Sequence, residues 1–89
     1  MYRIRFLGRA VDDLASIDFP HRRLIKEKLL ILAEDPEALK NNIRRLAGEL
    51  EGLYRLRVGS YRVVFKKDGK ELIILIVRIG HRKEVYLSS

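Results

Sequence analysis

Cysteine is absent from this sequence of 89 residues. The chain therefore forms no disulfide and no thiolate metal cluster, and nothing indicates an oxidising compartment. Long apolar runs are also absent, because the longest, Leu72 to Val77, is much shorter than the roughly 18 residues of a membrane span. The N-terminus, Met1 to Phe6, lacks the apolar segment of a signal peptide. We therefore expect a cytoplasmic protein that has no contact with a membrane.

The sequence also lacks the usual signatures of catalytic and cofactor sites. Its serines lie in no nucleophile motif, and neither of its two histidines has a nearby partner that suggests a catalytic triad. Two histidines without cysteine or a suitably spaced carboxylate do not form the ligand set of a metal site. The six glycines are scattered and form no phosphate-binding loop. We expect neither a metal nor another cofactor.

The length and the charge are more informative. A chain of 89 residues makes one domain, which we assign to residues 1–89. The net charge is +7, and it is uneven: residues 1–49 hold 10 basic and 8 acidic residues, whereas residues 50–89 hold 9 and 4. This excess in the second part favours a polyanionic partner such as nucleic acid, an anionic membrane or an acidic protein. The alternative is a charged surface that serves solubility alone.

Hydrophobic periodicity predicts a strand and two helices in the first part of the chain. Tyr2, Ile4 and Phe6 alternate with arginines, which is typical of a half-buried strand. Helical spacing then begins at Arg9 and continues to Ile17. After Pro20, a second helical pattern extends over residues 21–34. Two helices joined by a short turn predict a helical hairpin.

The second part reads as an irregular connection over residues 36–52, followed by strands. Gly59-Ser60 and Asp68-Gly69 have the composition of two-residue hairpin loops, of types II′ and I′. The expected strands are residues 53–58, 61–66 and 71–79, with a last short segment at 84–86. The fold class is therefore α+β: an N-terminal strand, a helical hairpin and an antiparallel β-meander, with the helices on one sheet face.

The first hairpin loop determines which residues share a face. With Gly59-Ser60 at the turn, Arg57 lies opposite Arg62, and Arg55 and Lys66 are on the same face. The other face is apolar and suited to the helices; it carries Tyr54, Leu56, Val58, Tyr61, Val63 and Phe65. Directly opposed arginines repel each other, at a cost of up to about 1 kcal/mol. A solvated outer face explains such a cluster less well than an anion site, because a guanidinium binds phosphate bidentately.

The second loop extends this register to the next strand. A two-residue turn at Asp68-Gly69 places Phe65 opposite Leu72. Ile73 and Leu75 are then on the face that carries Arg57 and Arg62, which we call the arginine side. This strand is apolar on both faces, which predicts an interior position in the sheet. Simple alternation puts Arg78 on the helix side, and it does not determine the face of the residues beyond Gly80.

The remaining polar residues suit RNA cleavage without a metal. In that reaction the substrate's own 2′-hydroxyl attacks the adjacent phosphate. The protein need only supply cations for the phosphorane, an acid for the leaving 5′-oxygen and an acceptor for the 2′ proton. Arg57 and Arg62 supply the cations, and Tyr86 is able to stack on a base.

Two segments resemble the RelE/ParE superfamily of bacterial and archaeal toxins, and its RelE branch in particular. Residues 53–65, LYRLRVGSYRVVF, are similar to the family's strand pair "YRLRVGDYRVIY", and residues 77–86, VRIGHRKEVY, to its ending "GHRREVY". The resemblance covers nearly the whole chain, and the order of elements agrees. Many members have a helix after the tyrosine, whereas here only three residues follow it.

The resemblance implies a toxin that cleaves mRNA in the ribosomal A site, without metal, and that a RelB-like antitoxin inhibits. By position, Arg62 matches the arginine that stabilises the phosphate, and Arg82 the general acid, for which His81 is a variant candidate. Tyr86 matches the tyrosine that stacks on the substrate base. Three further residues match phosphate-binding positions: Arg55, Arg57 and Lys83.

Two other functions remain open at this point. The same fold serves ParE-like toxins, which inhibit DNA gyrase and have no nuclease activity. A catalytically silent basic module that binds RNA or an acidic protein is the other alternative.

Overall fold

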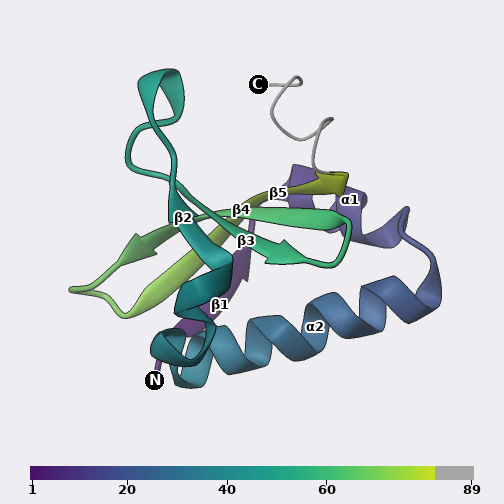
Figure 1. The fold of residues 1–89 in the computed structure, drawn as a ribbon, viewed down its shortest axis with the longest axis horizontal. Helices are drawn as coiled ribbons and strands as arrows, with labels where there is room; N and C mark the ends of the chain where they lie inside the picture. Colours follow the sequence, from purple (N-terminus) through teal and green to yellow (C-terminus); the bar gives the residue numbers. More distant parts are fainter. Residues whose placement is uncertain (82–89) are drawn as a thin grey trace.

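The computed structural model describes residues 1–81, which form a mixed five-stranded sheet with helices packed against one face (Figure 1). The α+β class and the helical hairpin are confirmed. Arg82, Lys83, Tyr86 and the short strand expected at residues 84–86 lie outside the described residues. In chain order the elements are β1 (Arg3–Phe6), α1 (Gly8–Ala15), α2 (Phe19–Glu34), η1 (Pro36–Asn42), β2 (Ile43–Arg45), η2 (Gly48–Leu50), β3 (Tyr54–Val58), β4 (Tyr61–Asp68) and β5 (Ile73–His81).

The strands lie in the order β1-β5-β4-β3-β2. The meander of β3, β4 and β5 is antiparallel and β5 is interior, as predicted, while β1 pairs with β5 in parallel. Strand β2 was not predicted, because it has three residues inside a segment without clear alternation. The partner of β1 was also unpredictable from local pattern, because a parallel pair is joined only through a long crossover.

The first hairpin has the predicted register. Arg57 lies opposite Arg62, Leu56 opposite Val63 and Arg55 opposite Val64. Gly59 has φ +59° and no non-glycine residue of the turn has a positive φ, as a type II′ turn requires.

The second hairpin differs from the prediction. Asp68 pairs with Ile73, so the loop spans four residues, 69–72, and Phe65 lies opposite Ile76 rather than Leu72. Neither Asp68 nor Gly69 has the positive φ of a type I′ turn; Leu72 has φ +55° instead. The Asp68 carboxylate closes this wider loop by accepting the backbone N–H groups of residues 70 and 71, at 3.0 and 3.1 Å. The shift is four residues, an even number, and so Ile73 and Leu75 stay on the arginine side as predicted.

A β-bulge in β5 changes the side on which Arg78 lies. The partners of Val64 and Phe65 are Arg78 and Ile76, which leaves Val77 as the extra residue. Alternation restarts after such a residue. Arg78 therefore lies on the arginine side, and the prediction that it faces the helices is wrong.

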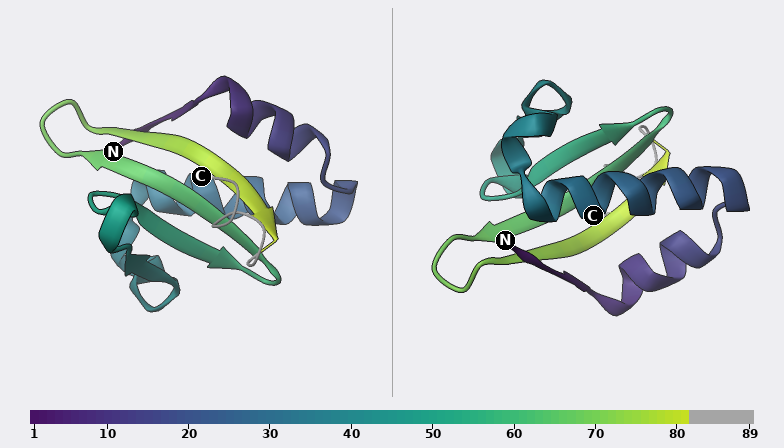
Figure 2. Two further views of the ribbon diagram at one scale, coloured as in Figure 1. Left: turned by 90° about the horizontal axis from the view of Figure 1, so that it is seen from above. Right: turned by 90° about the horizontal axis from the view of Figure 1, so that it is seen from below.

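The core lies between α2 and the sheet. Figure 2 shows α2 crossing the strands on one face, and Ile25, Leu29 and Leu32 supply its buried side. Facing them are the alternate residues of the strands, among them Leu56, Val63, Phe65, Ile74, Ile76 and Ile79. Among the helices of residues 1–81, none has the length and apolarity needed to cross a membrane.

Candidate functional site

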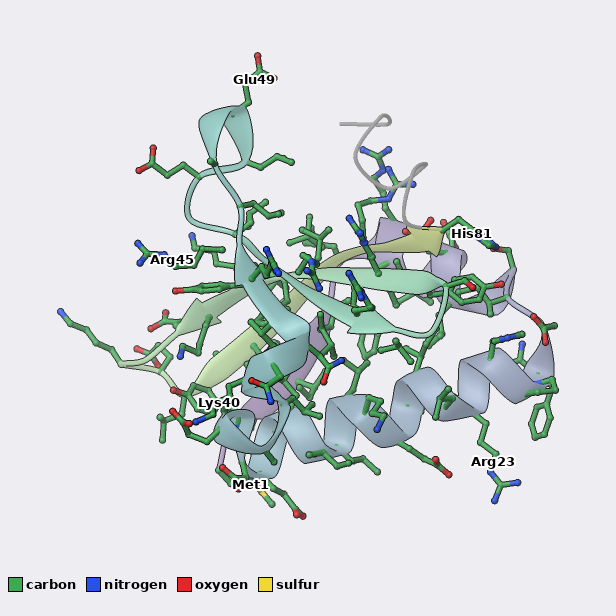
Figure 3. The ribbon with its side chains drawn as sticks, viewed as in Figure 1. Met1, Arg23, Lys40, Arg45, Glu49 and His81 are labelled. Atoms are coloured by element: carbon green, nitrogen blue, oxygen red, sulfur yellow. The ribbon has the colours of Figure 1, made fainter. Side chains whose placement is uncertain are left out.

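The sheet face opposite α2 is strongly basic, and we call it the cationic face. Its register places basic side chains from all five strands on one side. They are Arg3 and Arg5 of β1, Arg44 of β2, Arg55 and Arg57 of β3, Arg62 and Lys66 of β4, and Arg78 of β5. The β2–β3 loop, with Glu49 near its tip, rises from the sheet on the side away from α2 (Figure 3).

Arg57 and Arg62 form the row nearest the Gly59-Ser60 turn. They are directly opposed, and Gly80 of β5 lies on the other side of Arg62. Glycine has no side chain, so β5 places nothing beside the Arg62 side chain in this row. Arg57 is exposed and Arg62 is half-buried. Two guanidinium groups on neighbouring strands therefore project from one face of the sheet in the same row.

Arg55 is placed differently from what the sequence suggests. It lies on the predicted face, but it is only 5% exposed, and its Nη1 donates a hydrogen bond of 3.0 Å to the backbone carbonyl of Asn42. Val64, which lies directly opposite Arg55 on β4, is buried as well. The Arg55 guanidinium therefore contacts the chain just before β2, whereas Arg57 and Lys66 are exposed on the same face.

Arg44 lies directly opposite Arg55 and is exposed. Sequence reasoning missed it because β2 was not predicted, and the same is true of Arg3 and Arg5, whose strand had no assigned partner. The register of β1 against β5 puts these two arginines opposite Ile73 and Leu75, on the arginine side. The cationic face is therefore broader than the first hairpin alone indicates.

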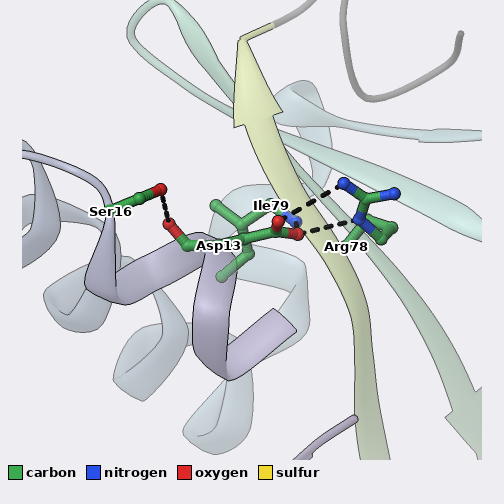
Figure 4. Close-up of polar contacts among 4 residues, drawn as sticks. All are labelled: Asp13, Ser16, Arg78 and Ile79. Atoms are coloured by element: carbon green, nitrogen blue, oxygen red, sulfur yellow. Dashed lines mark hydrogen bonds and ion pairs between the residues drawn. The ribbon is translucent and has the colours of Figure 1, made fainter. Parts of the chain in front are cut away.

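Arg78 connects this face to helix α1 (Figure 4). Its Nε and Nη2 donate to Oδ2 and Oδ1 of Asp13, at 2.9 and 3.3 Å, and the Ile79 backbone N–H donates to the same carboxylate at 2.9 Å. The hydrogen bonds to Asp13 raise the pKa of Arg78 above its usual value. The arrangement was not foreseen, because the two residues are 65 positions apart and neither belongs to a local motif.

His81 is not brought to the cationic face. It lies opposite Tyr61, a residue of the apolar face that packs against the core, and its ring centroid is 4.7 Å from that of Tyr61. Within residues 1–81, the structure pairs Arg57 with Arg62 and puts Lys66 further along the same face. The buried Arg55 lies in the row between them, and His81 is on the helix side.

A sheet with one helix-free face and two helices on the other is a fold that this chain shares with a RelE toxin of known structure. The family model described as "ParE toxin of type II toxin-antitoxin system, parDE" matches residues 4–86. The chain belongs to the RelE/ParE superfamily of toxins from type II toxin–antitoxin systems.

Individual relatives agree with this assignment. Toxin RelG of Mycobacterium tuberculosis (strain H37Rv) is 30% identical over 88 residues, which are 96% of this chain and 95% of that protein. Toxin RelE3 of Methanocaldococcus jannaschii is 32% identical over 89 residues, which cover 94% of each. The archaeal RelE–RelB complex from Pyrococcus horikoshii OT3 contains a chain of the same fold. Its TM-score is 0.75 at 30% identity, over 93% of this chain and 97% of that one.

Proposed function

We propose that this toxin is an endoribonuclease that cleaves mRNA in the ribosomal A site, in the cytoplasm and without a metal ion. The observation that carries the proposal is the directly opposed pair Arg57 and Arg62 on the helix-free face. Two kinds of support accompany it. Basic residues of all five strands extend this face, as a polyanion requires, and the two relatives described above are named Toxin RelG and Toxin RelE3.

In the proposed reaction, the 2′-oxygen of the substrate attacks the phosphorus of the adjacent phosphodiester while its proton passes to an acceptor. The bond from phosphorus to the 5′-oxygen breaks, which leaves a 2′,3′-cyclic phosphate and a 5′-hydroxyl. Arg62 and Arg57 stabilise the charge that develops on the phosphorane oxygens. We assign protonation of the leaving 5′-oxygen to Arg82, base stacking to Tyr86 and phosphate binding to Lys83.

Arg55 and His81 have smaller parts in this proposal. Burial of Arg55 under the face, with a hydrogen bond to Asn42, suits support of β2 and of the exposed arginines better than direct phosphate contact. The position of His81 on the helix side suits a structural part better than that of the acid.

Primer extension on translated mRNA, with purified toxin and ribosomes, tests the proposed activity. We expect cleavage within the codon in the A site, and no cleavage of the same mRNA without ribosomes. Trapped gyrase–DNA complexes without mRNA cleavage would instead identify a gyrase inhibitor. If neither is found, the protein is a silent binding module and the proposal is wrong.

We also propose a RelB-like antitoxin as the partner, because the Pyrococcus horikoshii relative was solved as a RelE–RelB complex.

Where such a partner meets the cationic face, it should be acidic, since complementary potentials accelerate association. We expect the association rate constant, measured by stopped-flow fluorescence, to fall roughly tenfold or more between low salt and about 0.5 M salt. An unchanged rate constant would indicate an apolar interface instead.

A further inference from the structure

The two histidines of the chain lie against the same tyrosine. The ring centroid of Tyr61 is 5.2 Å from that of His21 and 4.7 Å from that of His81, with interplanar angles of 51° and 48°. Tilted pairs at these separations have favourable aromatic geometry. We call these three residues the ring cluster; it lies at the end of the sheet where β5 finishes, and Figure 3 labels its His81.

Each ring comes from a different element. His21 lies in the first turn of α2, Tyr61 begins β4 directly after the Gly59-Ser60 turn, and His81 is the last residue of β5. The ring cluster therefore joins the start of a helix to the start of one strand and the end of another. Tyr61 is partly buried and also packs against the hydrophobic core, so it connects the cluster to the core.

Asp18 orients the outermost ring. Nδ1 of His21 lies 2.8 Å and 2.9 Å from the two carboxylate oxygens of Asp18, and because an ionised carboxylate only accepts, this nitrogen is the donor. The side-chain hydrogen bond from His21 lowers the pKa of Asp18 below its usual value. The Asp18 carboxylate thus accepts from the imidazole that lies against Tyr61.

The ring cluster is poorly suited to a role in core stability. The His21 side chain is 50% exposed and His81 is exposed as well, so the two imidazoles bury little apolar surface. The position of the ring cluster in the sequence suggests a different role. His81 directly precedes Arg82 and Lys83, to which the proposed function assigns the acid and a phosphate contact.

We propose that Tyr61 is a positioning residue for the catalytic C-terminal segment: held by His21, it fixes His81 on the helix side and so fixes the end of β5. Arg82 and Lys83 follow His81 directly in the sequence, so a fixed end of β5 limits where this segment begins. This inference rests on the proposed function for its catalytic consequence, although the anchoring itself does not.

Single-turnover cleavage on programmed ribosomes tests the catalytic consequence. We expect Tyr61→Leu to lower the maximal rate about 2- to 12-fold, the equivalent of one aromatic pair, with the toxin concentration at half-saturation unchanged. Tyr61→Phe keeps the ring and should retain the parent rate. Tyr54→Leu is the matched control, since Tyr54 is a half-buried tyrosine of the same face that stacks on Phe65, 5.5 Å away, and its rate should also be unchanged.

Variants of His81 separate positioning from acid catalysis, and they change an exposed residue at the end of β5. If His81 acts through its ring, His81→Phe retains the parent rate while His81→Ala behaves like Tyr61→Leu. If His81 is the acid, both variants lose activity, and the positioning proposal is overturned. Equal, unchanged rates for His81→Ala and the parent would overturn it too.

Two measurements without RNA test the anchoring itself. In Tyr61→Leu, the imidazole proton signals of His81 should move toward those of a free histidine, and native trypsin should cleave after Arg82 and Lys83 faster than in the parent or in Tyr54→Leu. If both observables equal those of the parent, the anchoring is refuted. If both change as expected while the parent cleaves no mRNA, the proposed function fails and the anchoring stands.

Discussion

Arg62→Ala is expected to lower the rate of ribosome-dependent mRNA cleavage by about 10²- to 10³-fold. The reason is its position: it is half-buried, directly opposite Arg57, and flanked on β5 by Gly80. A preorganised charge aimed at a developing oxyanion usually contributes this much to a rate. The measurement is the single-turnover rate on programmed ribosomes. Arg62→Lys should retain only part of the parent's cleavage rate, because an ammonium group cannot bind a phosphate bidentately.

Arg23→Ala is the matched control for this variant. Arg23 is an exposed arginine of α2 that points away from the sheet (Figure 3), so its loss lowers the net charge equally without touching the cationic face. We expect its cleavage rate to stay within about twofold of the parent, since long-range charge effects are screened at physiological salt. Arg62→Ala with a rate within about threefold of the parent would contradict the assignment of Arg62.

Asp13→Ala should lower the free energy of unfolding by about 2 kcal/mol, which corresponds to a Tm lower by roughly 8–16 °C in a domain of this size. The Asp13 carboxylate joins α1 to β5 by accepting from Arg78 at 2.9 and 3.3 Å and from the Ile79 backbone at 2.9 Å. The Arg78 and Asp13 side chains are 21% and 17% exposed, so water replaces these bonds poorly. Thermal unfolding followed by circular dichroism measures the change.

Asp12→Ala supplies the comparison for Asp13→Ala. Asp12 is the preceding residue of the same helix and is exposed, and its replacement should change the stability by no more than about 0.5 kcal/mol. Asp13→Asn should fall between the two, because an amide oxygen still accepts while the charge is lost. If Asp13→Ala and Asp12→Ala have the same Tm, the bonds to β5 contribute nothing measurable.

Features that depend on nearby residues could be predicted from the sequence. Gly59 accepts a left-handed φ, so the turn after β3 was predictable, and with it the pairing of Arg57 with Arg62. The second turn was not, because Asp68-Gly69 suits a two-residue loop by composition while the structure places four residues there. The wider loop depends on the Asp68 carboxylate, which accepts from the backbone of residues 70 and 71, and on the left-handed φ of Leu72. Composition reveals neither.

The α+β class, the helical hairpin, the antiparallel meander and the pairing of Arg57 with Arg62 were predictable, because each follows from periodicity or from a turn within a few residues. The parallel pairing of β1, the bulge at Val77, the burial of Arg55, and the contacts of Asp13 and His81 became visible only in the assembled fold. These features join residues that are distant in the chain. Their energies come from packing and hydrogen bonds that exist only once the elements have assembled, and so no local pattern encodes them.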